Sequence, residues 1–257
     1  MRDVAFLEQE ILRLGPWHHE VELAPDLSTR HWLEKGDADA PFFDPAKTLR
    51  DGLMRFFPSG LQGRSLLDCA CNCGGFLFAA RDAGVGRCFG FDVRQHWIDQ
   101  AEFLRASRAA PGDGIAFEVL DLYELPAKGL EPFDITLFNG ILYHLPDPVG
   151  GLRIAADLTR EVMVVNTQTA VGYPDGLMRV GREDTEGGLS GVYGLKFAPT
   201  GPSTIDTILR WAGFVETRVA WIREDDGGGN GSGRLEMVAS KVLGLLDGDP
   251  QSAPSPS

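Results

Sequence analysis

Short apolar runs alternate with amphipathic stretches of helical period through the middle of the chain. The runs have the length and the Leu, Ile, Val and Phe content of buried strands, and the stretches between them end near Gly or Pro, as helices do. They predict strands at 65–69, 87–92, 115–120, 133–138 and 161–166, and helices at 76–83, 94–108 and 149–159. Strands that are separated by helices imply parallel βαβ units with right-handed crossovers.

The same patterns continue on both sides of this region. Apolar positions at helical spacing predict helices at 3–14 and 46–57, within an N-terminal helical cap over residues 1–60. A helix at 203–212 and strands at 214–220 and 234–240 bring the predicted strands to seven. The predicted fold is therefore α/β, a doubly wound, mostly parallel, Rossmann-like seven-stranded sheet with an N-terminal helical extension.

Residues 61–243 are expected to form one domain around this sheet. Within it, residues 167–202 are rich in glycine and have no strong period, which is typical of a functional insertion or lid. The stretch 244–257 ends in PQSAPSPS and is expected to be a disordered tail.

Charge limits the classes of partner. The chain has 24 Lys and Arg against 37 Asp and Glu, a net charge of −13, and no two basic residues are adjacent. A surface that follows phosphates needs clustered cations, so we expect no nucleic-acid partner. Acidic residues interrupt the first fifteen positions and no long apolar run follows, so neither a signal peptide nor a membrane span is expected. The expected location is the cytoplasm, and the oligomeric state is left open, with a homodimer as one option.

The four cysteines do not form a recognisable metal or disulfide pattern. Cys69, Cys71 and Cys73 alternate within one turn and Cys88 stands apart, whereas metal thiolates come as spaced pairs. We interpret all four as small, buried structural residues.

The strongest chemical signal is the turn after the first predicted strand. Asp68 ends that strand, small residues follow up to Gly75, and a helix begins there. Such a turn allows close approach of the backbone to a ligand, next to the positive end of the helix. Asp92 ends the next strand, where a carboxylate is placed to hold the two ribose hydroxyls of a nucleoside.

The run Asp68-Cys69-Ala70-Cys71-Asn72-Cys73-Gly74 resembles the D-x-G-x-G-x-G motif of class I S-adenosylmethionine (SAM)-dependent methyltransferases. It is nearest to the D-x-G-C-N-x-G form in the branch of uridine-modifying, small-molecule and sugar O-methyltransferases. The resemblance covers roughly residues 64–158, with a weaker echo at 16–23, and Ala70 replaces the first glycine of the motif. An NAD-binding protein is the alternative, although the turn lacks the G-x-G-x-x-G spacing.

The resemblance implies SAM as the cofactor and assigns residues to its parts. The methionine part would be held by Asp68, Ala70, Cys71, Asn72 and Gly74. The ribose would be held by Asp92 and Val93, the adenine would face Asp121 and Leu122, and Asn139 would close on the sulfonium side.

His144 is the predicted catalytic residue. It follows the fourth strand, at the sheet edge where ligands bind in open α/β folds. A neutral imidazole at pH 7 can take the proton from an acceptor hydroxyl as the methyl group is transferred. A histidine that only packs or donates a hydrogen bond at the start of a loop is the alternative.

The acceptor is expected to be a small molecule with a hydroxyl group. We predict that it contacts His19, Tyr143, Asp147 and Tyr193. For His19 and its neighbour His18, the alternative is a half-exposed packing role beside Trp17 and Trp32. Aromatic platforms with acids suit a carbohydrate. By analogy with high-GC actinobacteria, whose composition this chain resembles, the acceptor would be an O-methylated mannose oligosaccharide or a glycolipid sugar of polysaccharide biosynthesis.

Three alternatives stay open. The resembled branch includes transferases that modify the wobble uridine of tRNA, and a catalytically silent SAM-binding scaffold has the same motif. Acids near the expected cleft, among them Glu20 and Glu22, leave room for a Mg²⁺ that aids ionisation of the hydroxyl, but no spacing specifies a metal site.

Overall fold

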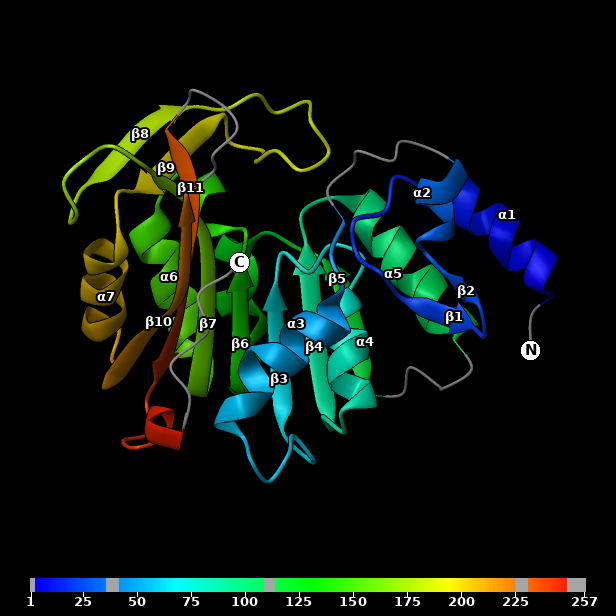
Figure 1. The fold of residues 1–257 in the computed structure, drawn as a ribbon, viewed down its shortest axis with the longest axis horizontal. Helices are drawn as coiled ribbons and strands as arrows, with labels where there is room; N and C mark the ends of the chain where they lie inside the picture. Colours follow the sequence, from blue (N-terminus) through cyan, green and yellow to red (C-terminus); the bar gives the residue numbers. More distant parts are fainter. Residues whose placement is uncertain (1–2, 36–41, 109–113, 225–230, 249–257) are drawn as a thin grey trace. The chain divides into compact units, whose positions relative to one another are not determined.

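The computed structural model describes residues 3–35, 42–108, 114–224 and 231–248, and Figure 1 traces their fold. The described residues form two compact units that divide between Asp121 and Leu122. No helix among the described residues combines the length and the apolar character that crossing a membrane requires.

The first unit is built on three parallel strands. Its elements are α1 (Val4–Leu14), β1 (Glu22–Ala24), β2 (Leu27–Ser28), α2 (His31–Lys35), α3 (Pro45–Asp51), η1 (Leu53–Phe56), β3 (Ser65–Cys69), α4 (Gly75–Asp82), β4 (Arg87–Asp92), α5 (Gln95–Ser107) and β5 (Ile115–Val119). β3 pairs with β4 and β4 with β5, so that Asp68 lies beside Gly90 and Gly90 beside Phe117. Every residue of β3 is buried, including the polar residues Ser65 and Asp68, as is usual for a strand inside a parallel sheet.

A buried glutamine ties the N-terminal segment to the core of the first unit. Gln100 on α5 is fully buried, and its Nε2 donates to the carbonyl oxygens of Leu14 and Pro16 at 2.7 Å each. Leu14 ends α1, where carbonyl groups have no partner within the helix, so the Gln100 amide supplies a donor. The indole of Trp17 is also fully buried and donates to the carbonyl of Ile11 at 2.7 Å.

The second unit is built on four strands. Its elements are η2 (Leu122–Lys128), β6 (Phe133–Asn139), η3 (Leu142–His144), α6 (Pro148–Asp157), β7 (Thr159–Ala170), β8 (Met178–Arg182), β9 (Leu195–Pro199), α7 (Pro202–Trp211), β10 (Glu216–Glu224), β11 (Ser232–Ser240) and η4 (Leu246–Gly248). β6 and β7 are parallel, and β11 pairs antiparallel with both β7 and β10. The buried face of α7 consists of Ile205, Ile208 and Leu209.

The predicted fold class is confirmed. Three parallel strands in the first unit and four strands in the second, two of them parallel, are the seven strands of a mostly parallel α/β sheet. β3 and β4 have the predicted bounds, because both are short, largely buried runs that end at a turn. β1, β2 and α2 lie between the two predicted N-terminal helices, at 3–14 and 46–57, where no element is predicted.

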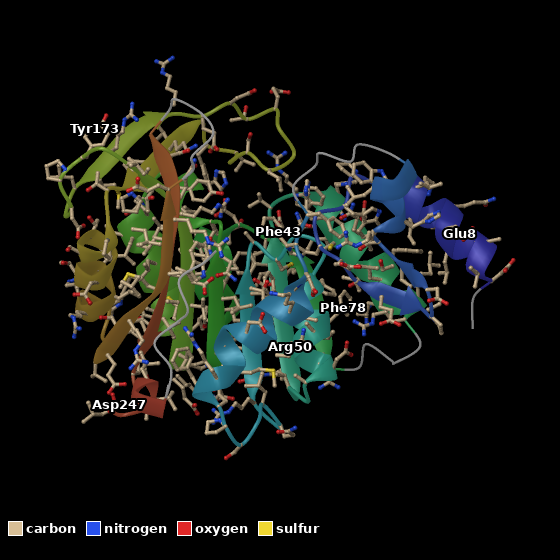
Figure 2. All side chains as sticks on the ribbon, viewed as in Figure 1. Glu8, Phe43, Arg50, Phe78, Tyr173 and Asp247 are labelled. Carbon is tan, nitrogen blue, oxygen red and sulfur yellow. The ribbon has the colours of Figure 1, made fainter. Side chains whose placement is uncertain are left out.

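The region 167–202 contains an antiparallel hairpin of β8 and β9, drawn in yellow-green in Figure 1. β8 is exposed along most of its length, and its five residues are too short a run to give a strong periodic signal. Figure 2 labels Tyr173 ahead of this hairpin, and the guanidinium of Arg179 on β8 lies 5.6 Å from the centre of its ring.

Part of the region expected as a tail, 244–257, is described. Residues 244–248 contain η4, and Leu246 there is buried. Residues 249–257 lie outside the described residues.

Candidate active site

The turn after β3 has an unusual backbone. Ala70, Asn72 and Gly74 all adopt left-handed conformations, with φ of 59°, 52° and 76°. Hydrogen bonds hold this shape: the amide of Cys71 donates to the carbonyl of Phe91 at 2.9 Å, and the amide of Gly74 donates to the carbonyl of Cys71 at 2.9 Å. The alternating left-handed residues make a tight turn of the backbone next to the positive end of α4.

Glycine is required where this turn meets α4. A Cβ on Gly74 would lie 2.5 Å from the ring of Phe117, and its φ favours glycine as well. A Cβ on Gly75 would lie 2.7 Å from the Cβ of His19 and 2.8 Å from Pro45. The first turn of α4 therefore packs tightly against both β5 and the N-terminal segment of the first unit.

Asp92, the last residue of β4, is linked to the turn after β3. Its Oδ2 accepts a hydrogen bond from the amide of Asn72 at 3.1 Å, and its Oδ1 accepts one from the amide of Arg94 at 3.1 Å. Each carboxylate oxygen keeps acceptor capacity for a ligand hydroxyl. Burial raises the pKa of Asp92 to about 6, and the hydrogen bonds from the backbone amides oppose that rise.

Asp68 lies near Asp92 and is almost completely buried. Burial and the negative charge of Asp92 raise the pKa of Asp68 well above its ordinary value. Two buried carboxyl groups at adjacent strand ends are costly when ionised, and a cationic ligand would offset that cost. SAM carries an ammonium and a sulfonium group, so the donor set fits SAM.

The cysteines of the turn are structural, as predicted. Cys69, Cys71, Cys73 and Cys88 are free and buried, and burial raises the pKa of each thiol. A buried thiol with a raised pKa is a poor nucleophile and a poor metal ligand.

The predicted ribose and adenine residues differ in exposure. Val93 is exposed and Asp121 is half-buried, and the amide of Leu120 donates to the carbonyl of Asp92 at 3.0 Å, which joins the ends of β4 and β5. Leu122 is buried in the core of the second unit, where a Cβ on Gly151 would lie 3.0 Å from it. These cofactor assignments stay predictions.

His19 is buried, which corrects the alternative of half-exposed histidines at 18 and 19. Its exposed fraction is 9%, and that of His18 is 7%. The ring of His19 packs edge-on to Phe76 at 5.4 Å, and burial together with the charge of His18 lowers its pKa to about 3. His19 is therefore neutral at pH 7, and its Nδ1 has no hydrogen-bond partner among the described residues.

Asn139 supplies a second buried polar atom without a partner. It is the last residue of β6, and its Oδ1 is buried without a hydrogen bond to any described residue. Buried acceptors are nearly always satisfied, so such an atom at a strand end suits a ligand that donates a hydrogen bond.

His144 lies in a polar cluster of the second unit. Its Nδ1 is 2.7 Å from Oε2 of Glu183, and both side chains are largely buried. Tyr143 precedes it, and its hydroxyl accepts a hydrogen bond from Nη2 of Arg234 at 3.3 Å. Lys196 Nζ lies 5.8 Å from the centre of the Tyr143 ring.

Burial is the largest influence on the pKa of His144 and lowers it. The hydrogen bond and the charge of Glu183 oppose the decrease, while the charges of Lys196 and Arg234 add to it. The net lowering leaves a neutral imidazole at pH 7, which is the form that a general base requires.

Asp147 and Tyr193 serve local structure. Asp147 caps α6, since its Oδ1 accepts from the amide of Gly150 at 2.9 Å. Its backbone amide donates to the hydroxyl of Tyr123 at 3.1 Å, and Tyr193 lies edge-on to the ring of Tyr123 at 6.2 Å. Contact with an acceptor stays a prediction for His19, Tyr143, Asp147 and Tyr193.

Sequence reasoning missed three charged residues around His144. Glu183, Lys196 and Arg234 come from different parts of the region after β7, and none belongs to a recognisable motif. Within the described residues, no group of three or more His, Cys, Asp and Glu side chains could hold a metal ion, so nothing here supports Mg²⁺.

Known proteins match this chain in sequence and fold. Residues 61–183 match a family model described as a methyltransferase domain. A tRNA U34 carboxymethyltransferase of Ectopseudomonas mendocina is 30% identical over 158 residues, which are 62% of this chain and 47% of that protein. One of Azotobacter vinelandii is 29% identical over 217 residues, covering 83% and 61%. This chain thus spans about half to three fifths of these curated relatives.

Two solved structures show the shared fold. The N-terminal domain of EvdMO1, determined in the presence of SAH and D-fucose, has a TM-score of 0.72 at 23% identity and covers 93% of this chain and 97% of that one. Magnesium protoporphyrin IX methyltransferase of Synechocystis PCC 6803, with bound SAM, has a TM-score of 0.51 at 17% identity and covers 75% and 78%. Residues 61–183 are thus similar to a methyltransferase domain, and the chain shares the fold of these two solved structures.

We predict that Ala70→Gly stabilises the protein. A left-handed conformation costs a residue with a Cβ about 1–2 kcal/mol, and the greater freedom of glycine in the unfolded chain offsets about 0.5–1 kcal/mol of that. The expected net gain in the free energy of unfolding is about 0.5–1 kcal/mol, measured by urea denaturation. Ala79→Gly, inside α4, is the matched control and should lose about 1 kcal/mol. Equal losses in both variants would contradict the strain at Ala70.

Proposed function

We propose that this chain binds SAM and transfers its methyl group to a hydroxyl group of a small acceptor, with His144 as the general base. The observation that carries the proposal is the pairing of a largely buried imidazole with a carboxylate, His144 Nδ1 to Glu183 Oε2 at 2.7 Å. Because Nδ1 faces Glu183, the proton of the acceptor would go to Nε2.

The cofactor assignment is supported by the first unit. The ribose hydroxyls would donate to Asp92, and the ammonium group would lie at the turn of Asp68, Ala70, Cys71, Asn72 and Gly74. When bound, SAM supplies an electrophilic methyl group on a sulfonium. The protein's own work is to bind, to orient the acceptor and to remove its proton.

A carbohydrate is the acceptor class that we propose. The acidic chain and its isolated basic residues argue against several phosphate contacts, and aromatic side chains such as Tyr143 and Tyr193 suit sugar rings. D-fucose, present in the solved structure of the EvdMO1 domain, is the first sugar to test. A mannose oligosaccharide and a glycolipid sugar are further acceptors to test in the same assay.

Modification of a tRNA uridine is the second candidate. The curated relatives are tRNA U34 carboxymethyltransferases, and a carboxymethyl group carries a carboxylate. Lys196 and Arg234, both beside Tyr143, are cations that could complement such a group.

We expect no tight tRNA binding at low salt, where phosphate contacts are strongest. A gel-shift titration against tRNA measures this binding, with other RNA of equal length as competitor. Tight binding with a steep salt dependence would overturn the sugar proposal and favour uridine modification. SAM binding without turnover of any sugar or tRNA would instead favour the scaffold alternative.

Asp92→Ala should weaken SAM binding by orders of magnitude. Two charge-assisted hydrogen bonds of about 1.5–3 kcal/mol each would be lost, which corresponds to at least a hundredfold rise in Kd. In the wild type, Kd should rise as the pH falls below about 6, because the protonated carboxyl group loses acceptor capacity. Calorimetry between pH 5 and 8 measures both, and Asp99→Asn, exposed on α5, is the control. Unchanged affinity in a folded Asp92→Ala protein would rule out this role.

His144→Ala should lower turnover by about 10²–10⁴-fold while SAM affinity stays constant, because a general base acts in the transition state. In the wild type, kcat/KM should rise with pH through an ionisation below the ordinary histidine value of 6.5. Release of SAH in the presence of the acceptor measures turnover, and His96→Ala, exposed on α5, is the control. Near-normal turnover in His144→Ala would refute the assignment and make Asp147 the next candidate.

A further inference from the structure

The segment 183–194 links β8 to β9 and is closed by hydrogen bonds of its own. The amide of Glu183 donates to the carbonyl of Gly194 at 3.1 Å, which continues the ladder of the hairpin beyond Arg182 and Leu195. Within the segment, the amide of Ser190 donates to the carbonyl of Gly187 at 3.0 Å. Glu183 therefore stands at a fixed point, where a regular hairpin passes into a turn.

The carboxylate of Glu183 has two partners on one oxygen. Its Oε2 lies 2.7 Å from Nδ1 of His144 and accepts a hydrogen bond from the amide of Gly191 at 3.1 Å. The exposed fractions of the two side chains are 16% for His144 and 11% for Glu183. A carboxylate that a backbone amide holds in place, away from solvent, has little freedom to leave the imidazole.

Gly191 provides independent evidence that the segment is shaped around His144. A Cβ at position 191 would lie 2.8 Å from the Cβ of His144, 3.0 Å from its Nδ1 and 2.7 Å from Oε2 of Glu183. No side chain fits in that space without moving the pair. The backbone of the segment thus packs directly on the imidazole, and glycine is required there by this close approach.

We propose that Glu183 is the positioning residue of His144: its carboxylate accepts a hydrogen bond from Nδ1–H, leaves Nε2 as the basic nitrogen, and stabilises the imidazolium after Nε2 gains a proton. The catalytic part of this inference rests on the proposed function. In the step, the acceptor O–H bond breaks, Nε2 gains that proton, and the Nδ1 proton stays on the imidazole beside Glu183. The hairpin insertion after β7 thereby contributes to the chemistry of η3.

The charges around the imidazole give this role a measurable signature. Glu183 faces His144 from the hairpin segment, Lys196 lies on β9, Arg234 lies on β11, and the Tyr143 ring lies 4.1 Å away. Glu183 is the group among these that raises the pKa of His144. Neutralising Glu183 leaves burial and two cations, so the pKa of His144 should fall.

The variant that tests the proposal is Glu183→Gln, which keeps the size of the side chain and removes its charge. NMR of the histidine ring nitrogens should show a lower pKa of His144 and a smaller share of the Nδ1–H tautomer. With an acceptor, kcat should fall about 10–100-fold, and the acidic limb of the kcat/KM profile should move to lower pH. SAM affinity should stay unchanged, and Glu183→Asp should restore part of the kcat.

Glu186→Gln is the matched control, because Glu186 is an exposed carboxylate in the same segment. It should leave the titration of His144 and the kcat unchanged. A His144 titration that is identical in the wild type and Glu183→Gln would overturn the positioning role. So would an unchanged kcat in Glu183→Gln.

The NMR experiment also separates this proposal from the proposed function, because it needs no acceptor. A shifted titration together with full activity of His144→Ala would refute the catalytic role of His144 and, with it, that of Glu183. Gly191→Ala provides a second variant, which should displace the pair and change the Nδ1 signal without altering any charge.

Discussion

The hydrogen bond from the Asn72 amide to the Asp92 carboxylate is the contact on which the turn between β3 and α4 depends. The turn between β3 and α4 places Ala70 and Asn72 in left-handed conformations, which tertiary contacts must hold. Asp92 provides such a contact from the end of the neighbouring strand, at the cost of a buried carboxylate. With Asp68 beside it, the site brings two buried carboxyl groups together, and Arg94 is a cation whose charge acts on Asp92. That arrangement is unfavourable for folding alone and favourable for binding a cationic nucleoside.

In the second unit, a chain of hydrogen bonds orients the polar groups near His144. Asn166 on β7 donates from Nδ2 to Glu236 at 3.1 Å, so its Oδ1 faces Arg234, which donates to it at 3.0 Å. The register of β7 and β11 places Asn166 directly opposite Glu236, which sets up this pairing. The other end of the Arg234 guanidinium then reaches the hydroxyl of Tyr143 at 3.3 Å. Glu236 fixes the orientation of the Asn166 amide, and Asn166 fixes that of Arg234, so the orientation of Arg234 follows from the strand register.

The sequence was sufficient for the parts of the fold that depend on local pattern. β3 and β4 are short, largely buried runs with an acid at the last position or next to it, and their bounds, the turn and the position of Asp92 could all be predicted from that pattern. The hairpin of β8 and β9 could not, because each strand has only five residues, too few to give a strong periodic signal in a glycine-rich region. Glu183 could not either: it lies far from His144 in the chain, and only the hairpin geometry brings them together. The burial of His19 could not be predicted, because it follows from packing against Phe76 and Gly75 that no local pattern contains.

The net charge of the chain and the local charge beside Tyr143 bear on different contacts with an acceptor. A total of −13 with dispersed basic residues disfavours contact with a long phosphate backbone, since that requires many cations at regular spacing. Beside Tyr143, however, Lys196 and Arg234 create a small positive region within this acidic chain. Two cations suit one anionic group, on the acceptor or on the group that is transferred, and they also weaken His144 as a base. Glu183 opposes that second effect, so the site can keep its cations for binding and still hold an imidazole that accepts a proton.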